Sequence, residues 1–167
     1  MNLNDIKTGD RVVLDANIFL YAIQNSSNQC RTLLERCAKD ELAGVLPSHI
    51  LAEVMHQLML AEARANAWIR AANPARQLGR QPERIQQLSR YMALVNDILA
   101  IGLAQEPLAP ADFISAMAIS RQAGLLTNDA LLASVAQRLR IDSVASADRH
   151  FERVVGITLY SPDDLQE

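Results

Sequence analysis

A short apolar run followed at once by an aspartate constrains the fold of this chain more than any other stretch. Val12, Val13 and Leu14 are typical of a buried strand, and apolar residues resume at helical spacing directly after Asp15. The carboxylate therefore follows the C-terminal end of a strand, where open α/β sheets place their ligands. On this stretch alone, a helix cap is the first interpretation of Asp15 and an active-site residue the second.

Strand-like and helix-like patterns alternate along the rest of the chain. Further strands are expected at 45–46, 101–104, 143–147 and 157–160, and helices at 29–39, from 47 onward, 83–99, up to a cap at Gly124, and 125–139. Gly44 is expected to end the helix at 29–39. Alternation of this kind predicts an α/β fold, a short parallel sheet with right-handed crossovers and helices on both sides. We expect one domain over residues 1–167, with its core at about 11–162.

The arginines are concentrated in one region. The whole chain has 16 basic and 19 acidic residues, a formal charge of −3, but residues 62–90 hold six arginines against two glutamates, or +4. The remainder therefore carries −7. This arginine-rich helix–loop region, with Arg76 and Arg80 as candidates, is either a solvated face or a surface that contacts RNA phosphates. Residues 65–82 are interpreted as a loop or tip between two helices because prolines and a glycine interrupt the pattern.

Composition excludes several classes of protein. No apolar run approaches the length of a membrane span, and the N-terminus lacks the apolar region of a signal peptide, so a cytoplasmic protein without membrane contact is expected. Cys30 and Cys37 lie seven residues apart on one expected helix, about 10 Å along its axis, which is too far for a disulfide. We predict two reduced, buried, unreactive thiols.

Four carboxylates are expected near one edge of the sheet. Asp148 follows the strand at 143–147 just as Asp15 follows the first strand. Glu53 and Asp129 lie on helices entered close to that edge, although each has a simpler interpretation, Glu53 as a boundary residue and Asp129 as a first-turn acid that suits the helix dipole. Asp112 is interpreted in the same way, first as a cap-region residue. Four ionised carboxylates this close would need a cation, and all-oxygen ligands favour Mg²⁺ or Mn²⁺.

The segments around these acids resemble the PIN-domain ribonucleases, and among them the VapC-type toxins. The resemblance is carried by Leu14-Asp15-Ala16-Asn17, Ala52-Glu53-Val54, Asn128-Asp129-Ala130 and Ser146-Ala147-Asp148, and it spans nearly the whole chain. It implies a PIN-like fold in which Asp15, Glu53, Asp129 and Asp148 form the catalytic, metal-binding quartet. Asn17 and Ser146 match the small polar positions that support the first and last aspartates. The region at 65–82 departs from the compact toxins in being longer and interrupted by prolines.

The function implied by this resemblance is hydrolysis of RNA phosphodiester bonds with Mg²⁺ or Mn²⁺, by an endoribonuclease that is the toxin of a type II toxin–antitoxin system. The metal would polarise the scissile phosphate and activate a water for in-line attack. The resemblance also implies a homodimer and an antitoxin protein that blocks the site. Two alternatives stay open: a PIN nuclease in RNA maturation without an antitoxin, and a non-catalytic PIN module that binds RNA or protein.

Overall fold

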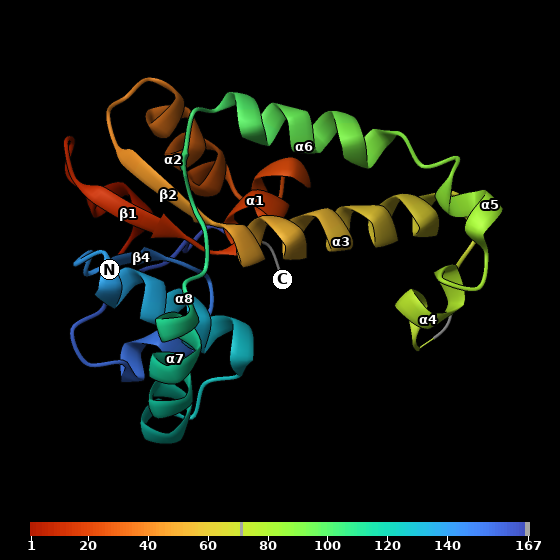
Figure 1. Ribbon diagram of the computed structural model, residues 1–167. Helices are drawn as coiled ribbons and strands as arrows, with labels where there is room; N and C mark the ends of the chain where they lie inside the picture. The colour runs from red at the N-terminus through yellow and green to blue at the C-terminus, as the bar shows by residue number, and fades with distance from the viewer. Residues whose placement is uncertain (71, 166–167) are drawn as a thin grey trace.

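A five-stranded, all-parallel sheet forms the centre of the protein, as the alternating pattern predicts (Figure 1). The computed structural model describes residues 1–70 and 72–165. The strand order is β3-β2-β1-β4-β5. The strands are β1 Arg11–Leu14, β2 Ala43–Pro47, β3 Ala104–Glu106, β4 Ser143–Ala145 and β5 Thr158–Tyr160.

Helices of very different length connect these strands. The α-helices are α1 Ala16–Ile23, α2 Asn28–Ala38, α3 Ser48–Ala65, α4 Pro74–Leu78, α5 Pro82–Ile85, α6 Arg90–Ala100, α7 Pro110–Ala123 and α8 Thr127–Arg138. Two short 3₁₀ helices, η1 Leu3–Asp5 and η2 Arg149–Arg153, complete the chain. Figure 1 shows α2 and α6 on one side of the sheet and α7 and α8 on the other, which confirms the expected α/β arrangement.

The order in which strands are added to the sheet reverses beside β1. Because β2 and then β3 lie on one side of β1 while β4 and β5 lie on the other, the switch point of the topology falls between β1 and β4. Val13 pairs with Val144 and Leu14 with Ala145 in this parallel ladder. The residues that follow, Asp15 and Ser146, therefore emerge side by side where an open α/β sheet forms its binding crevice.

One expected helix is interrupted. The prediction of a continuous helix over 83–99 is wrong, because the chain forms α5, leaves helical geometry and starts again at α6. The cause is Glu62 on α3, whose carboxylate accepts hydrogen bonds from the backbone N–H groups of Ser89, Arg90 and Tyr91 at 2.8–3.1 Å. A side chain 27 residues earlier in the sequence thus supplies the N-terminal cap of α6.

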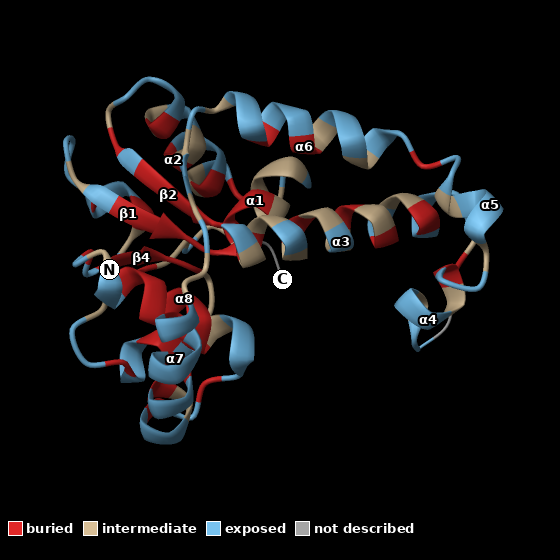
Figure 2. Cartoon of the chain, viewed as in Figure 1, coloured by how far each residue is buried: buried red, intermediate tan, exposed pale blue. Residues whose placement is uncertain are grey.

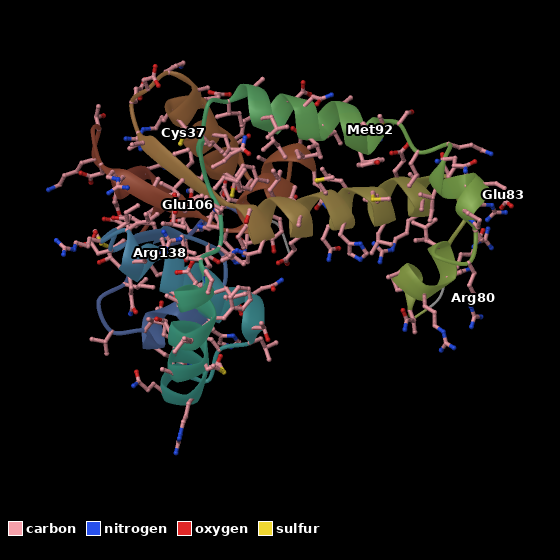
Figure 3. All side chains as sticks on the ribbon, in the orientation of Figure 1. Cys37, Arg80, Glu83, Met92, Glu106 and Arg138 are labelled. Atoms are coloured by element: carbon pink, nitrogen blue, oxygen red, sulfur yellow. The ribbon has the colours of Figure 1, made fainter. Side chains whose placement is uncertain are left out.

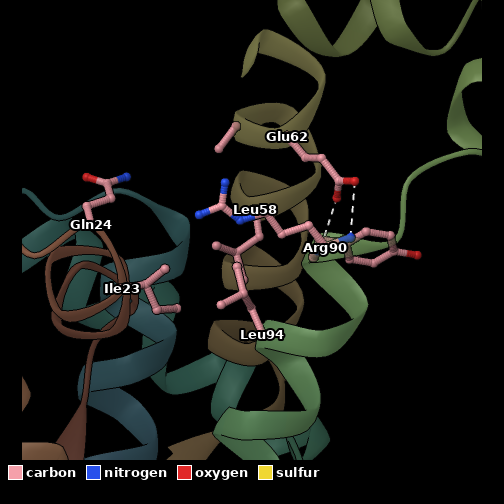
Figure 4. A pocket seen from close by; sticks show the side chains of 8 residues that line it. Ile23, Gln24, Leu58, Glu62, Arg90 and Leu94 are labelled. Atoms are coloured by element: carbon pink, nitrogen blue, oxygen red, sulfur yellow. Dashed lines mark hydrogen bonds between the residues drawn. The ribbon is translucent and has the colours of Figure 1, made fainter. Parts of the chain in front are cut away.

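Figure 4 shows this cap beside a small cavity of about 130 Å³ between α1, α3 and α6. Ile23, Leu58 and Leu94 are among the residues that line it. Burial acts to raise the pKa of Glu62, but the three N–H donors outweigh burial and lower it. The cap therefore fixes both the start of α6 and its distance from α3.

The expected end of one helix and the expected position of one strand need correction. Gly44 does not end the preceding helix, which stops at Ala38; it lies within β2. A Cβ at this position would lie 2.5 Å from Leu103 Cδ2 and 2.9 Å from Cys37 Sγ, so the strand passes too close to its neighbours for a side chain. The third strand is also later than expected, at β3 rather than 101–104, because Gly102 adopts a left-handed φ of 84°.

Both cysteines are buried free thiols, as predicted. Each faces the main core from α2, and burial raises the pKa of Cys30 and raises that of Cys37 to about 11. Thiols with raised pKa values are poor nucleophiles at neutral pH because little thiolate is present.

We expect the double variant Cys30→Ala/Cys37→Ala to remain folded but to lose roughly 1–3 kcal/mol of unfolding free energy, because the lost atoms leave small cavities. Urea denaturation measures this loss. In the native wild type, both thiols should react with an aromatic disulfide reagent only after unfolding. Rapid labelling of either thiol in folded protein would contradict the structural role.

Within the described residues, no helix combines the length and the apolar character needed to cross a membrane.

Candidate functional site

Asp15 lies at the centre of a polar network where β1 and β4 end. It is buried, with 7% of its surface exposed, and its Oδ1 accepts a hydrogen bond from the N–H of Ala16 at 2.7 Å, which makes it the N-cap of α1. Its Oδ2 accepts from the Ser146 hydroxyl and from the Asn17 amide, each at 2.6 Å. Asp15 is therefore the helix cap of the simpler interpretation and also the most buried carboxylate of the expected quartet.

Asn17 and Ser146 hold this network together across the switch point. The Asn17 amide also donates to Ser146 Oγ at 3.0 Å, and its Oδ1 accepts from the N–H of Ala147 at 3.0 Å. Ser146 Oγ accepts in addition from the N–H of Asp148 at 2.9 Å. The two small polar residues thus tie Asp15 to the backbone that carries Asp148, which fixes the relative position of the two aspartates.

Glu53 reaches the same edge from α3. Its side chain is half-buried, and its Oε2 accepts a hydrogen bond from the Asn128 amide on α8 at 2.7 Å. His49, one turn earlier on α3, has its Nε2 3.2 Å from the Asn128 carbonyl oxygen. Burial lowers the pKa of His49, so its neutral imidazole can donate to that carbonyl. Asn128 therefore joins α3 to α8 beside the carboxylates.

Asp129 and Asp148 are the remaining two members of the expected quartet. Asp129 lies half-buried in the first turn of α8. Asp148 caps η2 by accepting from the N–H of His150 at 2.8 Å, and its Oδ1 lies 3.2 Å from His150 Nδ1. Two carboxylates thus come from the last third of the chain and two from the first.

The carboxylates of the quartet are close enough to raise one another's pKa. Burial raises the pKa of Asp15 to about 6, and the negative charges of Asp129 and Glu53 add to the rise. Burial also raises the pKa of Asp129, with further contributions from Asp148 and Glu53 and an opposing one from His150. Each member of the expected quartet therefore lies within electrostatic reach of at least one other. We name these four residues the acidic edge.

The donor set of the acidic edge fits a hard divalent cation in its chemistry. The atoms Glu53 Oε1, Asp148 Oδ2 and both oxygens of Asp129 accept no hydrogen bond from the described residues, so lone pairs remain for a ligand. In the present side-chain conformations, however, no three acidic, histidine or cysteine side chains of the described chain are arranged to hold a metal ion.

Two residues of this edge were missed by the sequence analysis. Asn128 binds the Glu53 carboxylate, and His150 lies against Asp148. Asn128 directly precedes Asp129 and could have been identified as a polar neighbour, but its partner lies 75 residues away and no local pattern indicates it. His49 lies half-buried at the boundary of α3, against Asn128.

The arginine candidates lie away from the acidic edge. Arg76 is on α4 and Arg80 follows it, and both are exposed at the far end of α3 from the sheet. Figure 3 shows Arg80 there, near Glu83. With Asn73, Gln77 and Gln81 they line an open groove of about 430 Å³.

Solved structures similar to this chain share its fold across nearly its whole length. They include VapBC2 from Rickettsia felis, bound to a DNA fragment from its promoter, with a TM-score of 0.58 and 20% identity over 92% of this chain and 99% of that one. A toxin–antitoxin complex from Klebsiella pneumoniae has a TM-score of 0.53 and 16% identity, covering 88% and 95%. PAE2754 from Pyrobaculum aerophilum has a TM-score of 0.52 and 16% identity, covering 90% and 89%.

A comparison with models of protein families gives a match over most of the chain. The family model described as PIN domain matches residues 12–157, which include the whole acidic edge. A comparison with curated proteins gives no match.

Proposed function

The chain belongs to the PIN-domain family, and we propose that it is a divalent-metal-dependent endoribonuclease that acts as the toxin of a toxin–antitoxin pair. One observation carries the proposal: carboxylates that follow β1 and β4 and that lie on α3 and α8 meet at the switch point of the sheet. Ser146 hydrogen-bonds both Asp15 and the backbone of Asp148, and Asn128, next to Asp129, hydrogen-bonds Glu53. Repulsion among these carboxylates destabilises the folded protein unless a bound cation compensates for it, and such clusters are typical of functional sites.

The cation would be held by the acidic edge, Asp15, Glu53, Asp129 and Asp148. It would be Mg²⁺ or Mn²⁺, because carboxylate oxygens are the ligands that these ions prefer. When bound, the cation would supply charge stabilisation for the scissile phosphate and a more acidic water. Asn17 and Ser146 fix the buried Asp15 through its Oδ2, and Asn128 orients Glu53. These hydrogen bonds hold two of the four carboxylates, Asp15 and Glu53, in place, which lowers the cost of reorganising those two ligands.

The toxin role and its partners rest on the similar structures. Two of them are a VapBC pair and a toxin–antitoxin complex. We infer that this chain likewise binds an antitoxin protein, forms a homodimer and acts in the cytoplasm. A size measurement of the purified chain, alone and co-expressed with the product of an adjacent short reading frame, tests both partners.

The direct test is cleavage of total cellular RNA by the purified chain with Mg²⁺, with Mn²⁺ and with a chelator. Cleavage that requires metal supports the endoribonuclease. If no condition yields metal-dependent cleavage, the ribonuclease is excluded and the protein is a PIN module that binds without catalysis.

Metal binding itself gives a separate prediction. Mn²⁺ titrated calorimetrically into the wild type should show binding that Asp15→Ala loses, because Asp15 is the most buried carboxylate of the acidic edge. The control Asp10→Ala removes an equal charge just before β1, at the opposite end of the strand. Equal binding by wild type and Asp15→Ala would remove Asp15 from the proposed site.

A further inference from the structure

The segment between α3 and α6 forms a compact unit at the end of α3 farthest from the sheet (Figure 1). We name the described residues 66–70 and 72–89, which include α4 and α5, the arginine tip. It has a small apolar core of its own, separate from the main core. The buried residues of this core are Leu60, Ala63, Ile69, Leu78 and Leu88. Figure 2 shows a few buried positions among exposed ones in the region of α4 and the end of α3.

The backbone of the tip is held by local hydrogen bonds and prolines. Asn73 caps α4 by accepting from the N–H of Arg76, and Pro74 and Pro82 occupy the first positions of α4 and α5. Proline at these positions fixes φ in a helical value and removes an N–H that would lack a partner. The arginines are therefore carried by an ordered scaffold.

The charge of the tip is not neutralised by its own carboxylates. No ion pair among residues 1–70 and 72–165 involves an arginine of the region 62–90. Glu62 is occupied by the backbone of α6, and Arg84 stacks over Trp68 at 5.8 Å and donates to its carbonyl. Among the described residues, the guanidinium groups of Arg76 and Arg80, four positions apart, have no hydrogen-bond or ion-pair partner, so their donors are available to an external anion. Guanidinium groups suit phosphate because their fork of N–H donors matches its oxygens.

The tip and the acidic edge lie on the same side of α3. Leu60 follows Glu53 by seven residues, which is about 20° short of two full helical turns, so both project in nearly the same direction. Leu60 is buried in the core of the tip with Leu78 of α4, while Glu53 reaches Asn128 at the acidic edge. From Glu53 to Ala65 the axis of α3 runs for about 18 Å, and α4, which carries Arg76, packs against the last turns of α3 through Leu78 and Leu60.

We propose that the arginine tip is a second RNA-docking surface, which holds the backbone of the substrate at a distance from the acidic edge. The enzyme then prefers RNAs whose chain extends from the cleaved bond past α3, because only these contact both surfaces. The proposal rests on the ribonuclease function. At about 3.4 Å of rise per nucleotide in a helical strand, 18 Å corresponds to roughly five or six nucleotides, so shorter RNAs reach only one surface.

Binding of fluorescein-labelled oligouridines to catalytically inactive Asp148→Asn protein tests this proposal without cleavage. One probe has about three nucleotides, too short to span roughly 18 Å at about 3.4 Å per nucleotide, and the other has about 24, a length within reach of both surfaces. Adding Arg76→Gln/Arg80→Gln should weaken binding of the long probe about tenfold at low salt and flatten its salt dependence by about 0.7 per lost phosphate contact. Binding of the short probe should weaken less, because it can still bind at the acidic edge.

Matched controls separate docking from net charge and from misfolding. Arg11→Gln/Arg140→Gln removes the same charge at the opposite edge of the sheet and should leave both probes unaffected. Arg76→Lys/Arg80→Lys keeps the charge and should retain most of the salt dependence. Circular dichroism verifies the fold of each variant. In the active protein, Arg76→Gln/Arg80→Gln should raise KM for long RNA while leaving kcat unchanged.

Several outcomes overturn the proposal. They are equal loss for both probes, equal loss in the opposite-edge control, and unchanged binding of the long probe. Unchanged RNA binding would assign the tip to an acidic protein partner instead. If the tip variant loses binding of the long probe while the wild type cleaves no RNA with any metal, the docking surface stands and the proposed ribonuclease fails.

Discussion

Asp148→Asn should reduce metal-dependent RNA cleavage by about 10²–10³-fold while the protein stays folded, since removing one preorganised electrostatic group costs about this much. The asparagine keeps the shape of the side chain, and its Oδ1 can still accept from the N–H of His150 that Asp148 binds at 2.8 Å. What it removes is one negative charge near Asp129. Without metal, the variant should melt at the same temperature as wild type or slightly higher, because repulsion is relieved.

The matched control for this variant is Asp142→Asn, the same substitution just before the other end of β4. It should cleave RNA at the wild-type rate. Because the carboxylates act as a unit, Asp15→Asn/Asp148→Asn should be little worse than either single variant. Expression of wild-type protein without a partner should arrest growth, and Asp148→Asn should relieve the arrest. Wild-type cleavage by purified Asp148→Asn in saturating Mg²⁺ would remove this residue from the site.

Part of the acidic edge was predictable, because parallel strands impose simple geometry. Once Val12, Val13 and Leu14 are identified as a central strand, Asp15 must emerge at its C-terminal edge, and the strand expected over 143–147 places Asp148 at the same edge. That strand ends earlier than expected, at Ala145, so Ser146 follows it directly, and Ser146 then links Asp15 to the backbone of Asp148. The hydrogen bond between Ser146 and Asp15 is the register of β1 and β4 continued by one residue.

The parts that could not be predicted depend on single side chains that reach across the fold. Glu62 sets the start of α6 at Arg90, inside the helix expected over 83–99, and no signal near residue 89 indicates this partner. Asn128 binds Glu53 across 75 residues. In both cases local periodicity is correct about helical propensity, and a distant hydrogen bond decides where the helix begins or which way a carboxylate points.

Asp112 combines a predicted role with an unpredicted one. It is the first-turn cap of α7 that the sequence indicates, since its Oδ2 accepts from the N–H of Ala109 at 2.7 Å. It is also 99% buried and bound by Arg138 of α8, at 2.8 Å from Nε and 3.0 Å from Nη2. Arg138 pairs in addition with Glu106 at 2.6 Å, which ties α7, α8 and β3 together (Figure 3).

Removing Arg138 should destabilise the protein more than removing the charge of Asp112. Arg138→Met leaves the Asp112 carboxylate buried without its counter-charge, which should cost about 3–5 kcal/mol of unfolding free energy. Asp112→Asn should cost only about 1–3 kcal/mol, because Arg138 is 30% exposed and keeps Glu106 and the carbonyl oxygen of Pro107. Urea denaturation at pH 7 measures both. An equal or larger loss for Asp112→Asn would contradict the asymmetry.

The dependence on pH separates lost charge pairing from lost packing. Burial acts to raise the pKa of Asp112, but hydrogen bonds from Arg138 and from the N–H of Ala109 outweigh burial and lower it. In wild type, this stabilisation is therefore complete above the unfolded pKa of about 3.9 and is lost as pH falls through the lower folded pKa. In Arg138→Met, burial remains without the cation, so the pKa of Asp112 should rise above its unfolded value. The penalty of that variant should then shrink as the pH falls, and Arg138→Met/Asp112→Asn should be more stable at pH 7 than Arg138→Met alone. A penalty that is the same at pH 4 and pH 7 would assign the loss to the packing of the arginine stem instead.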